Sequence, residues 1–123
     1  MILTLIAAFG GIGAAARFVI DGAIRARFST TFPTATAAIN LTGSFLLGLL
    51  TSAAAAGALA DLWVVAASIG FCGGYTTFST AMVETVRLAQ NGDYTRAVLN
   101  AAGTAVTTVA AAAAGIGIGS LLW

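Results

Sequence analysis

Four apolar stretches, each long enough to cross a lipid bilayer as a helix, make up most of this sequence. They run from about Ile2 to Ala23, from Ala35 to Ala56, from Leu62 to Ala89 and from Thr95 to Leu122. A helix needs about 20 mostly apolar residues to span the hydrocarbon core. Only 7% of the 123 residues are charged, whereas a water-exposed domain carries about 25%. The sequence therefore predicts an all-α membrane protein with four transmembrane helices.

The connections between these stretches are short, and none of them resembles a linker to a second domain. They span Arg25 to Thr34, Gly57 to Asp61 and Gln90 to Asp93. The only proline, Pro33, suits the start of the second helix, and Asn91-Gly92 is a typical turn sequence. We expect residues 1–123 to form a single four-helix transmembrane domain.

Glycines and hydroxyl side chains interrupt the third apolar stretch. The segment Gly70–Thr80 reads GFCGGYTTFST, and we expect the helix to break between Gly73 and Thr77, in the middle of the membrane. A break leaves backbone N–H and C=O groups unpaired, which a bilayer tolerates only where protein or a water-filled cavity satisfies them. The freed carbonyls could bind a small cation such as Na⁺. Alternatively, the break could be a simple kink whose freed groups are bridged by water.

The basic residues are all arginines, and they lie toward one side of the predicted membrane span. With four spans, both termini and the second connection share one side of the membrane. Arg25, Arg27, Arg87 and Arg96 lie near the other two connections, and Arg17 lies closer to them as well. Because cytoplasmic loops are enriched in basic residues, this distribution predicts that both termini lie outside the cytoplasm.

The inventory of reactive side chains argues against an enzyme. The sequence has no histidine and a single cysteine, Cys72, which excludes most metal clusters, Cys/His nucleophile pairs and an intramolecular disulfide. The net charge of +1 comes from scattered residues and gives no sign of nucleic-acid binding. No acidic residue lies in the middle of a span, where proton-coupled cation exporters need one. Mostly neutral donors remain, and these suit a small dehydrated anion beside a structural cation.

Polar side chains within the second and fourth spans are candidates for an anion pathway. Asn40 could donate a hydrogen bond to an anion, or it could make an interhelical hydrogen bond. Thr104 and Thr108 share one face of the fourth helix, with Asn100 and Thr107 nearby. These side chains could form a ladder of donors, or the threonines could bond back to their own helix carbonyls.

Two candidates directly follow the expected break. The positive edge of the Phe78 ring could meet an anion, and the Ser79 hydroxyl could donate a hydrogen bond to it. Either side chain could instead serve packing alone.

Charged side chains are spaced to pair along their own helices. Arg17, Asp21 and Arg25 follow one another every four residues, and Glu84 and Arg87 are three apart. Such ladders could anchor the helices at the membrane interface, and Arg17 could also gather anions at a pore mouth.

Small residues recur at a spacing that lets membrane helices approach closely. Gly70/Gly74 and Gly115/Gly119 have this spacing. They could pack helices within one subunit or form a subunit interface. Because four helices enclose little room for a pathway, we expect an oligomer.

Three segments, in this order, carry a resemblance to a known family. They are Gly10–Phe18 (GGIGAAARF), Asn40–Gly48 (NLTGSFLLG) and Gly70–Thr80. Together they closely resemble the signature segments of the Fluc (CrcB) family of fluoride channels, and the resemblance extends over the whole chain. It implies passive export of cytoplasmic fluoride across the bacterial plasma membrane. It also implies an antiparallel dual-topology dimer with two pores and one Na⁺ at its centre, structural and not transported.

The resemblance also assigns individual residues. The Na⁺ would be held by the backbone carbonyls of Gly73 and Thr76. Phe78 matches the first phenylalanine of the family's Phe box. The side chains that match the family's anion pathway are Asn40, Phe78, Ser79, Thr104, Thr108 and Arg17.

The chain departs from the family pattern at Ala81, where the family usually has a second phenylalanine. A pore built from two copies would lose part of its aromatic lining. The one-sided arginines also suit insertion in a single orientation, whereas dual topology needs little bias. These two features favour one half of a heterodimer, with a second family member inserted the opposite way, over a homodimer with an atypical pore.

Two other functions are open alternatives. A small multidrug-type exporter has the same architecture but needs a glutamate in the first span, and Ile2 to Ala16 holds no acidic residue. A weakly conducting or non-conducting subunit that only scaffolds its partner is compatible with Ala81.

Overall fold

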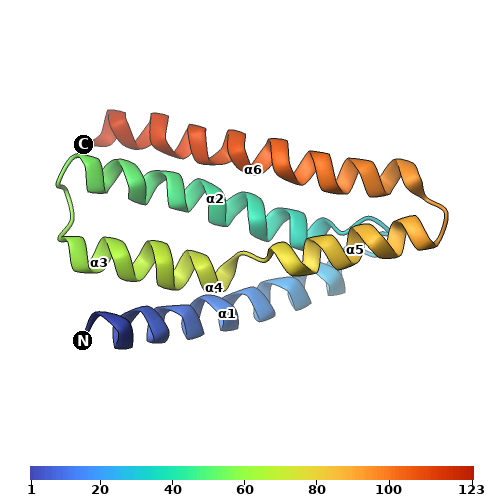
Figure 1. Cartoon of the computed structure of the whole chain (residues 1–123), viewed down its shortest axis with the longest axis horizontal. Coiled ribbons are helices and arrows are strands. Elements are labelled where there is room, and N and C mark those ends of the chain that lie inside the picture. The colour runs from blue at the N-terminus through green and yellow to red at the C-terminus, as the bar shows by residue number, and fades with distance from the viewer.

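The computed structural model describes all residues from 1 to 123, and they form helices joined by short connections (Figure 1). Four helical segments are long and apolar enough to cross a membrane. In chain order the elements are α1 (Ile2–Arg27), α2 (Thr34–Ala55), α3 (Asp61–Val65), the π-helix η1 (Ala66–Cys72), α4 (Gly73–Tyr75), α5 (Phe78–Gln90) and α6 (Tyr94–Leu122). The third span is composite and comprises α3, η1, α4 and α5. These elements confirm the prediction of an all-α protein with four potential spans.

The connections gather at two opposite ends of the bundle. Both termini and the α2–α3 connection lie at one end, and the α1–α2 and α5–α6 connections lie at the other (Figure 1). Arg25 and Arg27 belong to the last turn of α1, while Arg87 and Arg96 flank the α5–α6 connection. These four arginines therefore lie toward one end, as the sequence predicts. The side of the membrane that they face stays a prediction.

The observed helix boundaries are close to the predicted ones, with one clear difference in α1. The sequence predicts an end near Ala23, but α1 continues to Arg27. Arg25 and Arg27 favour this extension because cations stabilise the carbonyl end of a helix. Arg25 also pairs with Asp21 one turn back, at 2.7 Å.

The predicted helix start at Pro33 and the predicted turn at Asn91-Gly92 are both confirmed. Pro33 directly precedes α2. Gly92 ends α5 with a φ of +79°, the left-handed conformation that glycine adopts most easily.

The break in the third span is narrower than predicted. Only Thr76 and Thr77 leave the helical conformation, with φ/ψ of −78°/158° and −147°/114°. Gly73 to Tyr75 stay helical, in a register where a Cβ at Gly74 would overlap the backbone of Gly10 in α1. The preceding segment η1 is wound as a π-helix, which is not predicted from the sequence. Such segments occur frequently at functional sites.

Glycines let two pairs of helices meet backbone to backbone. Between α1 and η1, a Cβ at Gly13 would overlap the carbonyl of Phe71. Between α2 and α6, a Cβ at Gly48 would overlap the carbonyl of Ala112. We call these two contacts the glycine seams.

Both predicted small-residue pairs belong to the glycine seams. A Cβ at Gly70 would meet Ile6 of α1 at 2.8 Å, and one at Gly119 would meet Ser52 of α2 at 2.6 Å. Of the two roles that the spacing allows, the structure shows packing within one chain.

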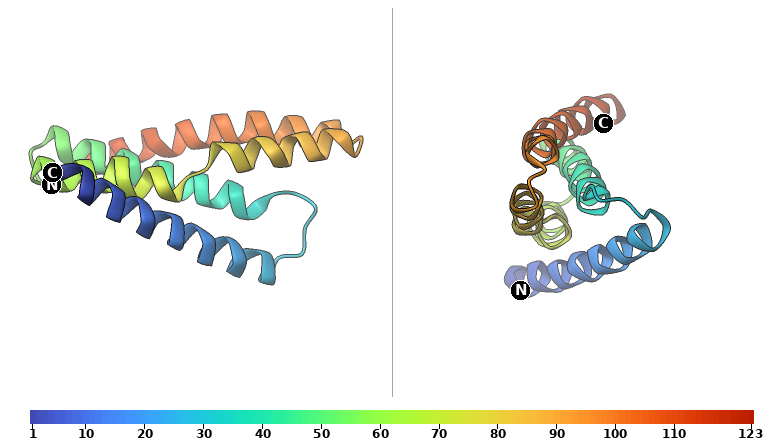
Figure 2. Two further views of the ribbon diagram at one scale, coloured as in Figure 1. Left: turned by 60° about the horizontal axis from the view of Figure 1, so that its bottom comes forward. Right: turned by 90° about the vertical axis from the view of Figure 1, so that its right-hand side faces the viewer.

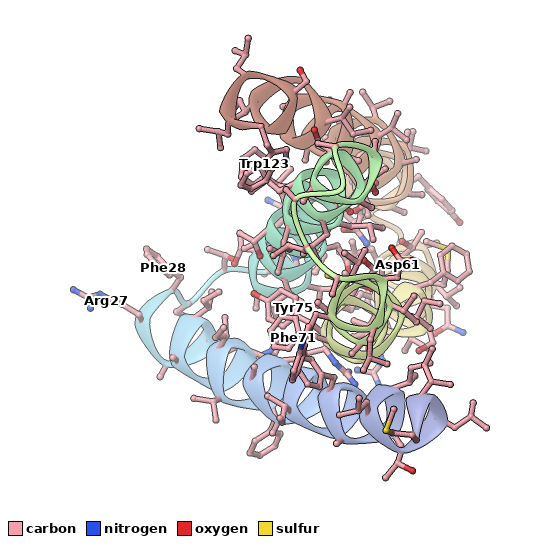
Figure 3. The ribbon with its side chains drawn as sticks, turned by 90° about the vertical axis from the view of Figure 1, so that its left-hand side faces the viewer. Arg27, Phe28, Asp61, Phe71, Tyr75 and Trp123 are labelled. Carbon is pink, nitrogen blue, oxygen red and sulfur yellow. The ribbon has the colours of Figure 1, made fainter.

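Large apolar side chains point away from the bundle. Phe18 is 82% exposed and Val109 is 71% exposed, and such apolar surface is suited to lipid or to another apolar protein surface. In contrast, the Phe71 and Tyr75 rings stack on the side of the third span that faces α1 and α2, with centroids 5.6 Å apart (Figure 3).

We predict that Gly48→Ala destabilises the folded chain. The new methyl group would collide with the backbone of Ala112, so the free energy of unfolding should fall by about 1–3 kcal/mol. Thermal unfolding in detergent micelles would measure the change.

Gly103→Ala in α6 is the matched control. Nothing lies within 4 Å of its Cβ position, and alanine favours a helix more than glycine does. Equal melting temperatures for the two variants would contradict the close contact between α2 and α6.

Candidate functional site

Asn40 of α2 satisfies the backbone at the helix break. Its Nδ2 donates to Thr77 O at 2.9 Å, and its Oδ1 accepts from Thr77 N–H at 2.8 Å. Asn40 is only 5% exposed, and a buried polar group without a partner costs about 1–3 kcal/mol. Of the two roles predicted for Asn40, the structure shows the interhelical hydrogen bond. Because Nδ2 carries a second hydrogen, donation to an anion stays a prediction.

The two threonines of the break complete the ends of the helices that flank them. On the N-terminal side of the break, Thr76 Oγ1 donates to Cys72 O at 2.9 Å. Thr77 Oγ1 accepts from Thr80 N–H at 3.2 Å, which is the geometry of a helix N-cap. The break is therefore hydrogen-bonded on both sides by side chains of the same chain.

Carbonyl oxygens at the break, among them those of Gly73 and Thr76, have lost their ordinary helical donors. Thr77 N–H would donate to Gly73 O in a continuous helix, but it donates to Asn40 instead. Thr76 O accepts no hydrogen bond from the backbone. Free carbonyl oxygens at an unwound helix are the ligands that Na⁺ uses in membrane transporters, so their chemistry fits the predicted site. No cluster of three or more His, Cys, Asp or Glu offers a different metal site.

A cavity of about 320 Å³ lies beside the break, against α2, η1, α5 and α6. We call it the break cavity. It brings together most of the residues that the sequence assigns to the ion sites. Those in its wall are Asn40, Gly73, Thr76, Phe78, Thr104 and Thr108.

The threonines of α6 partly bond back to their own helix. Thr108 Oγ1 donates to Thr104 O at 2.7 Å, and Thr107 Oγ1 donates to Gly103 O at 2.6 Å. These are the local bonds that the sequence offers as the alternative to a donor ladder. The Thr104 hydroxyl makes no such bond and lies in the wall of the break cavity. Donation by Thr104 and Thr108 to an anion stays a prediction.

Asn100 does not join the threonines in the break cavity. It is 2% exposed, and its Nδ2 donates to Ala81 O at 3.1 Å and to Thr85 Oγ1 at 2.8 Å. Asn100 therefore ties α6 to α5.

Phe78 and Ala81 occupy different environments although both line the break cavity. The Phe78 side chain is 78% exposed, so one chain alone does not cover it. Ala81 is 1% exposed. The aromatic part of the cavity wall is therefore supplied by Phe78 alone.

Arg17 and Ser79 lie outside the break cavity. Arg17 lines a second cavity of about 340 Å³ with Thr77 and Thr80, and its Nε donates to Gly74 O at 3.2 Å. Ser79 lines a third cavity of about 390 Å³ that also includes Glu84. The predicted anion residues thus line three different cavities around the break.

The predicted charge ladders are only partly correct. Arg25 pairs with Asp21 as expected, but Glu84 pairs with Arg25 of α1 at 2.9 Å rather than with Arg87. Arg17 makes no ion pair with Asp21, because its Nε donates to the Gly74 carbonyl that the break has freed. Contacts between helices therefore replace two of the contacts expected within a helix.

Thr36 and Glu84 are polar residues of the site that are not among the residues predicted for it from the sequence. Glu84 Oε1 accepts from Thr36 Oγ1 at 2.9 Å, while its Oε2 is buried without a hydrogen-bond partner. A sequence signal for both exists. Thr36 is four residues before Asn40, and Glu84 is four residues after Thr80, so each shares a helix face with a residue of the site.

The fold and the site together define a multi-pass membrane protein whose polar groups gather around a helix break. Such an arrangement is typical of membrane proteins that bind or pass ions.

Comparison with known proteins identifies the family. Residues 4–116 match the family described as CrcB-like protein, Camphor Resistance (CrcB). A relative named fluoride-specific ion channel FluC 1, from Leifsonia xyli subsp. xyli, is 46% identical over 98% of this chain and 88% of its own. A relative named fluoride-specific ion channel FluC 2, from Cutibacterium acnes, is 46% identical over 90% of this chain and 91% of its own. The chain belongs to the CrcB family of fluoride channels, and it is not an enzyme.

We predict that Asn40→Ala destabilises the chain by about 2–4 kcal/mol. The substitution leaves both backbone groups of the half-buried Thr77 without their partner. Unfolding in detergent micelles, followed by circular dichroism, would measure the loss.

Thr51→Val serves as the control for the loss of a polar side chain on α2. Thr51 Oγ1 donates only to Leu47 O in its own helix, so this variant should keep its melting temperature within a few degrees. An Asn40→Ala variant as stable as the native chain would show that the break does not depend on Asn40.

Proposed function

We propose that this chain is a subunit of a channel that exports cytoplasmic fluoride passively down its gradient. This proposal rests mainly on the break cavity, where Asn40, Phe78 and Thr104 meet beside an interrupted helix. The relatives named fluoride-specific ion channels support fluoride as the ion. Fluoride enters cells as neutral HF, ionises, and leaves through the channel as the anion.

The two helix ends at the break provide opposite charges for two ions. α5 begins at Phe78 and presents the positive end of its dipole, while α4 ends at Tyr75 and presents carbonyl groups. An anion is favoured near the first end and a cation near the second. This polarity supports a fluoride pathway beside a structural cation in the middle of the membrane.

We propose an antiparallel dimer as the working unit. Phe78 is highly exposed although it lines the break cavity, which supports a wall completed by a second subunit. In an antiparallel pair, the carbonyls of Gly73 and Thr76 from both subunits would hold one Na⁺ at the centre. Carbonyl ligands fix the separation of the subunits without consuming any side chain.

Ala81 favours a heterodimer over a homodimer. Its methyl group offers no aromatic edge to an anion, and Phe78 is the only aromatic side chain in the cavity wall. A second family member that carries the missing ring would complete the lining. In that arrangement this chain conducts weakly, or only supports the pore of its partner.

Fluoride efflux from liposomes that contain the purified chain alone tests the heterodimer, which predicts little or no efflux without a partner. A fluoride electrode would record the efflux, and chloride efflux would serve as the control for selectivity. Fast efflux restricted to fluoride would support a working homodimer. Absence of efflux from well-folded protein would contradict it, and co-expression with a second family member should then restore transport.

Phe78→Leu tests whether this chain lines a conducting pore or only scaffolds one. A conducting subunit should lose at least tenfold in fluoride flux, while Phe28→Leu, an exposed residue outside the break cavity, should conduct normally. Equal flux in both variants would favour the scaffold.

We predict that Na⁺ stabilises the assembled protein. A cation held by carbonyls of the folded state raises the melting temperature with its concentration. Melting curves in detergent with NaCl and with choline chloride at equal ionic strength would compare the two cations. Identical curves would argue against a resident Na⁺, whatever the flux measurements show.

A further inference from the structure

Two cavities with charged walls separate the second half of α1 from α5. Figure 2 shows α1 diverging from α5 toward the α1–α2 connection. The cavity of about 390 Å³ lies between these two helices, and the cavity of about 340 Å³ lies between α1, the start of α5 and Thr36 and Ile39 of α2. Both cavities include Asp21, Arg25 and Thr80 in their walls. We call these two neighbouring cavities together the α1–α5 cleft.

Arg25 bridges this cleft. Its Nε donates to Asp21 Oδ2 at 2.7 Å, and its Nη2 donates to Glu84 Oε1 at 2.9 Å. No other hydrogen bond joins α1 to α5. A single guanidinium group therefore faces both carboxylates of the cleft.

The sign of the charge in the cleft depends on this one residue. Its walls hold three arginines, Arg17, Arg25 and Arg87, and two carboxylates, Asp21 and Glu84. The net charge is thus positive by one unit. Glu84 contributes strongly because its side chain is 13% exposed and its Oε2 has no donor. Without Arg25 the net positive charge would vanish, and the two carboxylates would have no ion-pair partner.

We propose that Arg25 is a specificity-determining residue that lets small inorganic anions enter the α1–α5 cleft. It does so by neutralising Asp21 and Glu84, which leaves the charge of Arg17 available to the anion. This inference rests on the proposed fluoride channel, because it treats the cleft as the way from the arginine-rich end to the break. The role of Arg25 is electrostatic, so a lysine can replace it.

The charge change predicts the direction and size of the effect. A unit charge within about 10 Å is only partly screened at physiological ionic strength, and a charged cleft changes the local ion concentration about tenfold or more. Arg25→Gln should therefore reduce fluoride efflux from liposomes about five- to tenfold. Arg25→Lys should keep most of the flux.

A second substitution separates charge from structure. Asp21→Asn added to Arg25→Gln returns the net charge of the cleft to its original value but does not rebuild the bridge between α1 and α5. The proposal expects the double variant to regain most of the flux, and Asp21→Asn alone to conduct at least as well as the native chain. The proposal would be overturned if the double variant, or Arg25→Lys, had a fluoride flux as low as that of Arg25→Gln. Arg25 would then act by holding α1 and α5 together.

A measurement without transport keeps this test independent of the proposed function. Ser79 is exposed and lines the cleft, so Ser79→Cys in a Cys72→Ala background places one accessible thiol there. Its reaction rates with an anionic and a cationic methanethiosulfonate reagent report the local charge. Arg25→Gln should lower the anionic-to-cationic rate ratio about tenfold, and adding Asp21→Asn should restore it.

The two readouts distinguish the possible failures. A rate ratio that shifts as expected in a chain without fluoride flux would support the role of Arg25 and contradict conduction by this chain alone. A rate ratio unchanged by Arg25→Gln would overturn the proposal even if the native chain conducts. If Arg25→Gln does not fold, Asp21→Asn alone must still raise the anionic-to-cationic rate ratio at Ser79→Cys.

Discussion

The pair of hydrogen bonds between Asn40 and the backbone of Thr77 is the interaction on which the rest of the structure depends. A lipid environment offers no water to an unpaired peptide group, so an interrupted helix needs a partner from another helix. A carboxamide carries a donor and an acceptor side by side, so it can donate to the carbonyl and accept from the N–H of the same residue. Asn40 therefore converts a defect in the third span into a stable feature.

The stabilised break determines how the groups around it are placed and which partners they have. The Thr77 hydroxyl starts α5, which turns Phe78 toward the break cavity. The carbonyl of Gly74, freed from its helix, receives Arg17. Polar chemistry is thus concentrated in one region of a chain whose outer surface is otherwise apolar.

The sequence predicts the spans well because length and hydropathy alone determine which segments can cross a bilayer. It also locates the break, but not its extent: Gly73 to Tyr75 stay helical, where Gly74 packs against α1. The charge pairs are predicted less well. Glu84 meets Arg25, a residue 59 positions away, and no local spacing rule indicates a partner on another helix. Asn40 could be named from its type, whereas its partner, Thr77, required the structure.

The glycine seams have a consequence for motion. Where helices touch backbone to backbone, as at Gly13 and Gly48, no side chain at the contact can change rotamer, so sliding one helix past the other would require several close contacts to separate together. The seams join α1 to η1 and α2 to α6, and Gly74 of α4 packs against Gly10 of α1 in the same way, which leaves α5 outside these glycine contacts. We therefore expect a rigid frame with no large gate, in which ions pass by rearranging side chains and water rather than helices.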